Sequence, residues 1–194
     1  AMCDIVPEAM ADKSEKFGLE NIKRYTDYQE LLEIEKPELV AIATESGKHA
    51  SIALDCIAAG CHVIIEKPIA LSIADADAII KAGKDAGVIV CANHQNRFNK
   101  SIQYIRKALE AGRFGKLYHG AAHVRWNRSK NYYDQAPWRG TWGQDGGCLM
   151  NQCIHNIDLL RWMMGDEIDE VMAYTAQLEH PYLEAEDLGM ALVK

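Results

Sequence analysis

The chain has 194 residues, of which 48% are apolar and 25% charged, and its net charge is -7. This composition is ordinary for a globular protein and allows one large or two small domains. The acidic charge argues against nucleic acid or an anionic membrane as a partner, and no apolar run reaches the length of a membrane span. The start of the chain lacks the pattern of a secretory signal, and the six cysteines form no Cys-x-x-Cys pair. We therefore expect a cytoplasmic location and no metal site.

The first half alternates short apolar strands with helices. We expect strands at 1–5, 22–25, 38–43, 62–66 and 88–92, and helices at 7–17, 28–35, 49–59 and 73–86. This alternation predicts right-handed βαβ units and a parallel sheet. Residues 1–92 should therefore form a Rossmann-like, doubly wound α/β domain whose first strand is missing.

The second half has a different pattern. It offers a polar loop at 93–99, a helix at 100–111, an alternating strand at 117–126, an aromatic loop at 127–143, a helix at 147–165, and strands at 171–179 and 188–193. The alternation of apolar and polar residues is typical of a sheet with one wet face. Residues 93–194 should form an incomplete α+β domain with a largely antiparallel sheet.

The strand at 62–66 ends in Glu66, Lys67 and Pro68. Ligands of open α/β sheets bind outside the carboxyl ends of the strands, so Glu66 and Lys67 are expected at the mouth of a site. Pro68 also restricts the backbone of Lys67 to an extended conformation. For an isolated Glu-Lys-Pro sequence, a strand followed by a solvated turn is the simpler alternative.

Asp4 follows the first expected strand. In a dinucleotide-binding fold, an acidic residue at this place accepts hydrogen bonds from the adenosine ribose, which favours NAD over NADP. The glycine motif that normally precedes this acid is not present before Asp4, and a surface Asp in a turn is an equal alternative.

Three polar residues recur along the helix expected at 147–165. Asn151 and His155 are four apart, and Asp158 is three further, so the three would share one helix face. Such an array could handle protons because histidine titrates near physiological pH. A metal pair is a competing interpretation, but Asn is a poor ligand; a purely structural histidine is another alternative.

The loop at 127–143 and the residue before it concentrate aromatic and guanidinium groups. These are Trp126, Arg128, Tyr132, Tyr133, Trp138, Arg139 and Trp142. Such groups suit sugar faces and phosphates, through stacking and bidentate hydrogen bonds. They also suit a protein interface, and composition alone does not decide between the two.

Four motifs, taken in order, carry a resemblance to a known family. They are Ala43-Thr44-x-Ser46-Gly47-x-His49, Glu66-Lys67-Pro68, Asn96-Arg97-Phe98 and Gly146-Gly147-x-Leu149-x-x-x-x-x-His155-x-x-Asp158. Together they resemble the Gfo/Idh/MocA family of NAD(P)-dependent sugar oxidoreductases. Residues 93–98, 138–141 and 150–155 look most like its nucleotide-sugar branch, which oxidises UDP-N-acetylglucosaminuronic acid at C3 of the sugar.

The resemblance implies hydride transfer from a secondary hydroxyl of a sugar to NAD, with NADP less expected. The implied catalytic residues are Lys67, His155 and Asn151, the last standing where many members have Asp. The implied cofactor-side residues are Asp4, Thr44, Ser46, His49, Glu66, Lys67, Gln95, Trp138 and Arg139. The implied substrate-side residues are Arg97, Tyr133, Asn151 and His155, with Arg139 also a candidate.

Two departures from the family pattern bear on these expectations. Glu45 replaces the proline usual in the Thr44 loop. The missing glycine strand removes the backbone cradle for a pyrophosphate, so this polypeptide alone should bind NAD poorly, and we expect a longer parent or a fragment.

Two alternatives to the nucleotide-sugar reaction stay open. One is an inositol or simple-sugar dehydrogenase of the same family. The other is a catalytically silent assembly or ligand-binding module, since the family commonly forms dimers or tetramers through the open face of the second sheet.

Overall fold

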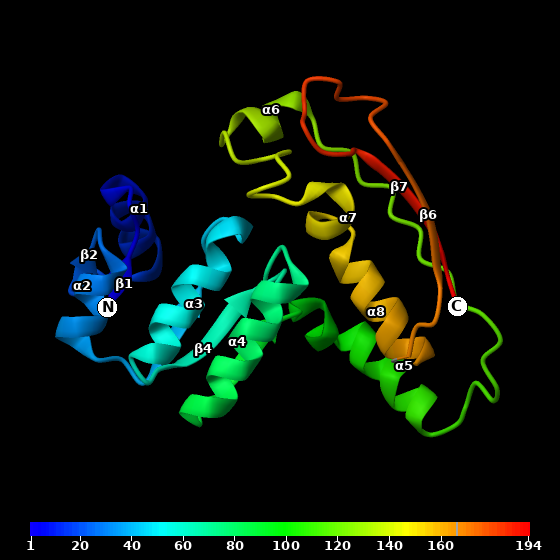
Figure 1. Ribbon diagram of the computed structural model, residues 1–194, viewed down its shortest axis with the longest axis horizontal. Helices are drawn as coiled ribbons and strands as arrows, with labels where there is room; N and C mark the ends of the chain where they lie inside the picture. The colour runs from blue at the N-terminus through cyan, green and yellow to red at the C-terminus, as the bar shows by residue number, and fades with distance from the viewer. Residues whose placement is uncertain (166) are drawn as a thin grey trace.

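The structure is a computed structural model that describes residues 1–165 and 167–194. Its first half contains a parallel sheet in the order β3-β4-β5, formed by Leu39–Ile42, His62–Glu66 and Val90–Asn93. The register aligns Ile42 with Ile65, and Ile65 with Ala92. A shorter parallel pair, β1 (Met2–Cys3) and β2 (Arg24–Tyr25), lies at the N-terminal end of Figure 1. The expected parallel α/β arrangement is confirmed.

The helices of this half begin and end within one residue of the bounds that the sequence predicts. They are α1 (Pro7–Phe17), α2 (Tyr28–Glu35), α3 (His49–Ala58, after a short 3₁₀ turn at Ser46–Lys48) and α4 (Ile73–Ala86). The Ser72 side chain accepts a hydrogen bond from the Asp75 backbone N–H at 3.0 Å and so caps α4. Gly18 and Gly87 end α1 and α4 in the left-handed conformation, with φ of 66° and 68°.

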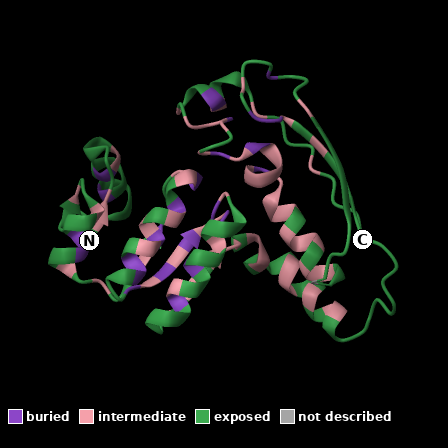
Figure 2. Cartoon of the chain, in the orientation of Figure 1, coloured by how far each residue is buried: buried purple, intermediate pink, exposed green. Residues whose placement is uncertain are grey.

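The buried hydrophobic cluster lies within residues 31–79, where α3 and α4 cover the sheet. Val63, Ile65 and Ile79 have no exposed surface. Figure 2 shows this burial concentrated on β4 and the helices beside it, whereas the second half is mostly intermediate or exposed. The most buried part of the molecule is thus the sheet whose central strand ends at Glu66 and leads into Lys67.

The second half combines helices with an antiparallel strand pair. Its elements are α5 (Lys100–Glu110), α6 (Lys130–Asp134), α7 (Gly147–Asn151), α8 (Ile154–Met164), β6 (Val171–Ala176) and β7 (Leu188–Val193). Strands β6 and β7 pair antiparallel, with Val171 opposite Val193. A 3₁₀ turn over Gln95–Phe98 connects β5 to α5. None of the helices in the described ranges is long and apolar enough to cross a membrane.

The prediction of a strand at 117–126 is wrong. These residues adopt no regular secondary structure. The backbone at Gly120 instead approaches the side chains of Leu160 and Met164 on α8, and Trp126 lines a cavity together with Leu188 of β7. Alternating apolar and polar residues indicate that one side of a segment is packed. A strand also needs a neighbouring strand that supplies backbone hydrogen bonds. Within the described residues, β6 and β7 pair only with each other.

The single helix expected at 147–165 is two helices. The backbone N–H groups of Gln152 and Cys153 both donate to the Cys148 carbonyl, at 3.0 and 2.9 Å. The bond from Cys153 spans five residues, which makes a wide turn, interrupts the α-helical ladder and separates α7 from α8. The sequence 147–165 has no proline that could have announced this break.

The two halves meet where the loop after β3 contacts residues 143–144. The Gly47 N–H donates to the Gln144 carbonyl at 3.2 Å. A Cβ atom on Gly47 would lie 2.5 Å from the Gly143 carbonyl oxygen, far inside van der Waals contact. Gly47 is therefore required by a close approach of two backbones.

We predict that Gly47→Ala lowers the free energy of unfolding by about 1–3 kcal/mol, because the added methyl group forces the two backbones apart. Gly143→Ala is the matched control, because a Cβ there meets no atom within 4 Å. Urea denaturation followed by circular dichroism measures both variants. Equal stability of Gly47→Ala and the parent protein would contradict the close packing.

Candidate active site

The carboxyl ends of the parallel strands bring together polar residues, several of which the sequence predicts for the cofactor side. Thr44 follows β3, Glu66 ends β4, and Asn93 ends β5. Glu66 and Asn93 are aligned in the register, and the Asn93 amide donates to the Glu66 carboxylate at 2.5 Å. Gln95 comes directly after, in the 3₁₀ turn. This row is the edge at which open α/β sheets bind their ligands.

His49 contacts the backbone that follows two of these strands. Its ring is buried, with Nδ1 2.7 Å from the Pro68 carbonyl oxygen and Nε2 3.1 Å from that of Thr44. Both ring nitrogens are thereby engaged by backbone. His49 therefore holds the Thr44 loop beside Pro68, and its place on the cofactor side stays a prediction.

Lys67 reaches from β4 to the second half of the chain. Its ammonium donates to the Asn151 side-chain oxygen at 2.7 Å and to the Asn151 carbonyl oxygen at 2.8 Å. Burial lowers the pKa of Lys67, and the charge of Arg128 lowers it further, while Glu66 and Asp145 act in the opposite direction. An ammonium has three donors, so one remains for another acceptor.

Asp145, which the sequence analysis missed, explains why Asn suits position 151. The Asn151 amide nitrogen donates to the Asp145 carboxylate, whose second oxygen accepts from the Gly140 N–H at 2.8 Å. Asp145 is buried, and burial raises the pKa of its carboxyl group. Asn151 can accept from Lys67 while donating to Asp145, whereas an Asp there would place two carboxylates together.

His155 lies at the start of α8, close enough to Lys67 for their charges to interact. Its Nδ1 is buried and has no hydrogen-bond partner among the described residues. Burial lowers the pKa of His155, and the charges of Lys67 and His94 lower it further. The ring is therefore neutral at physiological pH and has the capacity to accept a proton.

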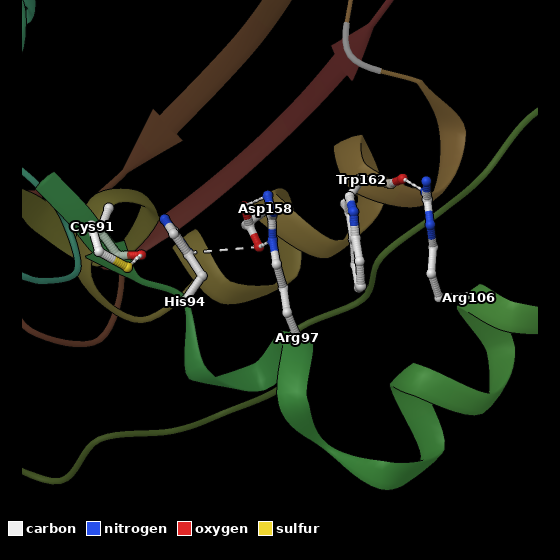
Figure 3. Close-up of polar contacts among 7 residues, drawn as sticks. Cys91, His94, Arg97, Arg106, Asp158 and Trp162 are labelled. Atoms are coloured by element: carbon white, nitrogen blue, oxygen red, sulfur yellow. Dashed lines mark hydrogen bonds and ion pairs between the residues drawn. The ribbon is translucent and has the colours of Figure 1, made fainter. Parts of the chain in front are cut away.

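Asp158 is turned toward Arg97 rather than toward His155. The Arg97 guanidinium binds both oxygens of the Asp158 carboxylate, at 2.8 and 2.5 Å (Figure 3). His94, a residue with no role expected from the sequence, lies with Nδ1 3.6 Å from the same carboxylate. The three predicted residues therefore do not form one array, because Asn151 contacts Lys67 and Asp158 contacts Arg97. Arg97 engages Asp158 through its Nε and one Nη2 N–H, and its place on the substrate side stays a prediction.

Trp162 braces this ion pair. Figure 3 shows its ring between Arg97 and Arg106, whose guanidinium carbons lie 5.0 and 4.9 Å from the ring centroid. Arg106 also pairs with Glu110 at 2.7 Å. These contacts join the 3₁₀ turn at Gln95–Phe98, α5 and α8 into one support behind the candidate site.

The remaining predicted residues are distributed around the aromatic loop and β1. Tyr133 is buried, and its burial raises the pKa of the phenol to about 12. Arg139 stacks on Tyr132 and on Trp138, with its guanidinium carbon 4.1 and 4.7 Å from the ring centroids. Asp4 follows β1, and its carboxylate accepts from the Val6 N–H at 2.8 Å.

A cavity of about 200 Å³ opens between the aromatic loop, α7 and β7. Its lining includes Arg128, Tyr133, Gln152, Cys153 and His180. Gln152 and Cys153 follow Asn151 in the chain, whereas Lys67, Asn151 and His155 are not among the residues that line this cavity.

Comparison with protein families assigns both halves. The family model described as "Oxidoreductase family, NAD-binding Rossmann fold" matches residues 1–94, and the GFO/IDH/MocA C-terminal domain matches residues 102–194. A myo-inositol 2-dehydrogenase of Thermotoga maritima is 32% identical over 174 residues, which cover 89% of this chain and 49% of that protein.

Solved structures of dehydrogenases also resemble this chain. The WlbA dehydrogenase of Bordetella pertussis, in complex with NADH and UDP-GlcNAcA, aligns with a TM-score of 0.91 and 39% identity. The WlbA dehydrogenase of Chromobacterium violaceum, with the same ligands, aligns with a TM-score of 0.89 and 36% identity. Each alignment covers 99% of this chain and 54% of the other. The chain therefore spans about half the length of these relatives.

We predict that the pKa of His155 lies below the ordinary histidine value of about 6.5 and rises when Lys67 is replaced by Met. A nearby positive charge disfavours the imidazolium, so removing that charge makes protonation easier. Titration of the His155 ring by NMR measures both pKa values. Lys81→Met, on the exposed face of α4, is the control and should leave the His155 pKa unchanged. An unchanged His155 pKa in Lys67→Met would contradict an electrostatic interaction between Lys67 and His155.

Proposed function

This chain belongs to the GFO/IDH/MocA family of NAD-binding oxidoreductases, and we propose that the complete protein oxidises a secondary hydroxyl group of a sugar. The observation that carries the proposal is the placement of Lys67. It ends the central parallel strand, is held by Asn151 through two hydrogen bonds, and retains one donor. A substrate hydroxyl at this donor would lie at the edge of the sheet where dinucleotides bind.

Lys67 and His155 divide the proton chemistry. Lys67 hydrogen-bonds the alcohol oxygen and stabilises the negative charge that develops as the proton leaves. His155, kept neutral by burial and by the charge of Lys67, takes that proton. Asn151 and Asp145 hold Lys67 in place. NAD, when bound, supplies the acceptor for the hydride that leaves the carbon.

The strand-end residues fit such a cofactor. Asp4 follows the end of β1, where an acid can accept hydrogen bonds from the adenosine ribose. Thr44 and Glu66 lie at the carboxyl ends of β3 and β4. Trp138 and Arg139, Ser46 and Gln95 complete the proposed cofactor side. An acid at Asp4 favours NAD over NADP because it repels a 2′-phosphate.

The proposed substrate is a nucleotide-linked N-acetylated sugar acid, oxidised at C3. The support for it is the similarity to the two WlbA dehydrogenases, whose complexes contain UDP-GlcNAcA. The second candidate is a cyclitol, favoured by the identity to a myo-inositol 2-dehydrogenase. Tyr133, His155 and Asn151 are proposed substrate-side residues in either case.

Three further expectations remain proposals. The division into domains at 1–92 and 93–194 is one, and a cytoplasmic location is another. The third is a homodimer or homotetramer formed through the second sheet, whose strands expose apolar side chains such as Met172, Tyr174 and Leu192.

We predict that His155→Ala in the complete protein lowers kcat by roughly 10²–10⁴-fold, the contribution of a positioned general base. The formation of NADH, followed by its absorbance with UDP-N-acetylglucosaminuronic acid or myo-inositol as substrate, measures the effect. His119→Ala is the control, because His119 is exposed and lies outside the site.

Near-parental turnover of His155→Ala would remove this residue from the mechanism. If the parent protein forms no NADH with a panel of UDP-sugars and cyclitols, yet assembles into a stable oligomer, the silent assembly module becomes the better account.

A further inference from the structure

The chain contains two pairs of cysteines that are five residues apart and share the same backbone contact. The Cys61 N–H donates to the Cys56 carbonyl oxygen at 3.0 Å, and the Cys153 N–H donates to the Cys148 carbonyl oxygen at 2.9 Å. Each hydrogen bond brings the two ends of its turn together. All four thiols are free. The two pairs therefore differ in their surroundings rather than in their spacing.

Cys56 and Cys61 belong to the hydrophobic core. Each exposes only 1% of its surface, and both lie in the buried cluster that α3 forms with the parallel sheet. Burial raises the pKa of Cys56 to about 12 and also raises the pKa of Cys61. Because the thiolate is the reactive form of cysteine, this pair should be inert toward oxidants.

Cys148 and Cys153 instead line the cavity of about 200 Å³ between the aromatic loop, α7 and β7. Their thiols share a hydrogen bond, which lowers the pKa of Cys153 and raises the pKa of Cys148, while burial and the charge of Glu186 oppose the change at Cys153. Cys153 also directly precedes the first residue of α8, where the positive end of the helix dipole stabilises a thiolate. This pair therefore combines a reactive thiolate, a neighbouring thiol and access from a cavity.

The turn between these two cysteines carries the residue that holds Lys67. Asn151 lies between Cys148 and Cys153 in the chain, and its side-chain and carbonyl oxygens both accept from the Lys67 ammonium. His155 comes shortly after Cys153, at the start of α8. A covalent bond between the two sulfurs would close a ring that includes the Asn151 backbone. It would therefore act on both acceptors of Lys67.

We propose that Cys148 and Cys153 form an oxidation site, at which a hydroperoxide converts the two thiols into a disulfide that moves Asn151 away from Lys67. The oxidation itself is independent of the proposed sugar oxidation, whereas its effect on turnover rests on that function. Exchange with a dithiol reopens the disulfide, because the cavity gives the reductant access to the sulfurs.

The reaction consumes one hydroperoxide for each pair of thiols. The Cys153 thiolate attacks a peroxide oxygen, the O–O bond breaks, and the departing hydroxide takes up a proton to become water, which leaves Cys153 as a sulfenic acid. The Cys148 sulfur then attacks the Cys153 sulfur, the S–O bond breaks, and hydroxide leaves with the Cys148 proton as a second water. Two thiols are thereby oxidised to one disulfide while hydrogen peroxide is reduced to water.

The test treats the complete protein with hydrogen peroxide, alkylates the remaining thiols with iodoacetamide in urea, and digests the protein with trypsin. Cys148 and Cys153 lie in the tryptic peptide 140–161, and Cys56 and Cys61 lie in the tryptic peptide 49–81, so mass spectrometry compares both pairs in one sample. We expect peptide 140–161 to lose two hydrogen atoms and to take up no iodoacetamide. Peptide 49–81 should be alkylated at both cysteines, and dithiothreitol should restore alkylation of peptide 140–161.

Serine variants assign the order of the two steps. In Cys148→Ser, we expect dimedone to trap a sulfenic acid at Cys153, because no thiol remains to displace it. Cys153→Ser should form neither the adduct nor the disulfide. Cys91→Ser removes an exposed thiol at a different site, on β5, and is the matched control that should form the disulfide as the parent does. A thermal midpoint close to that of the parent verifies that each variant is folded.

NADH formation measures the effect of the disulfide on turnover. Misplacing a catalytic group by about 1 Å costs roughly 10²-fold in rate, so we expect peroxide to lower kcat of the parent and of Cys91→Ser by about 10- to 100-fold. Dithiothreitol should restore kcat in both proteins. Cys153→Ser should have the same kcat before and after the peroxide treatment.

The proposal is overturned if peptide 140–161 takes up iodoacetamide at both cysteines after the peroxide treatment, or if Cys56 and Cys61 are oxidised as readily. It is also overturned if the disulfide forms and kcat does not change. Failure of the proposed function is a separate result, in which the parent forms no NADH before oxidation. The mass of peptide 140–161 then still reports whether the disulfide forms.

Discussion

The candidate site depends on the hydrogen bonds between Lys67 and Asn151. They join the end of the central strand to α7, and so connect the parallel sheet to the second half of the chain. A half-buried ammonium loses part of its hydration, and Asn151 replaces it with two acceptors from one residue. Asp145 then fixes the orientation of the Asn151 amide from the other side. The Lys67 amine is thus positioned by the uncharged Asn151 side chain, and the Asp145 carboxylate contacts Asn151 rather than Lys67.

The first half of the fold could be predicted closely because its signals are local. Ser72 caps α4, Gly18 and Gly87 end their helices, and the apolar strand at 62–66 is buried as its composition indicates. The second half was predicted less well because its structure depends on distant partners. Residues 117–126 alternate like a strand but pair with none, and the turn at Gln152 and Cys153 follows from a carbonyl shared by two N–H groups.

The same distinction applies to the site. The family resemblance, confirmed by both family models, led to Lys67, Asn151 and His155, and the structure places Lys67 and Asn151 in direct contact. The partners of these residues could not be predicted from the sequence. Asp145 is an unremarkable acid in sequence, and Asp158 is expected beside His155. Only the folded chain assigns Asp145 to Asn151 and Asp158 to Arg97. The composition of the aromatic loop is equally consistent with a ligand site and with a protein interface.

The central claim is that Lys67 and His155 converge on one hydroxyl group of the substrate. The most direct measurement is a crystal structure of the complete protein with NADH and UDP-N-acetylglucosaminuronic acid. We predict that the Lys67 ammonium and a His155 ring nitrogen both lie within about 3.2 Å of the same sugar oxygen. A structure in which these two nitrogens face separate cavities, with the sugar bound beside only one of them, would contradict the account.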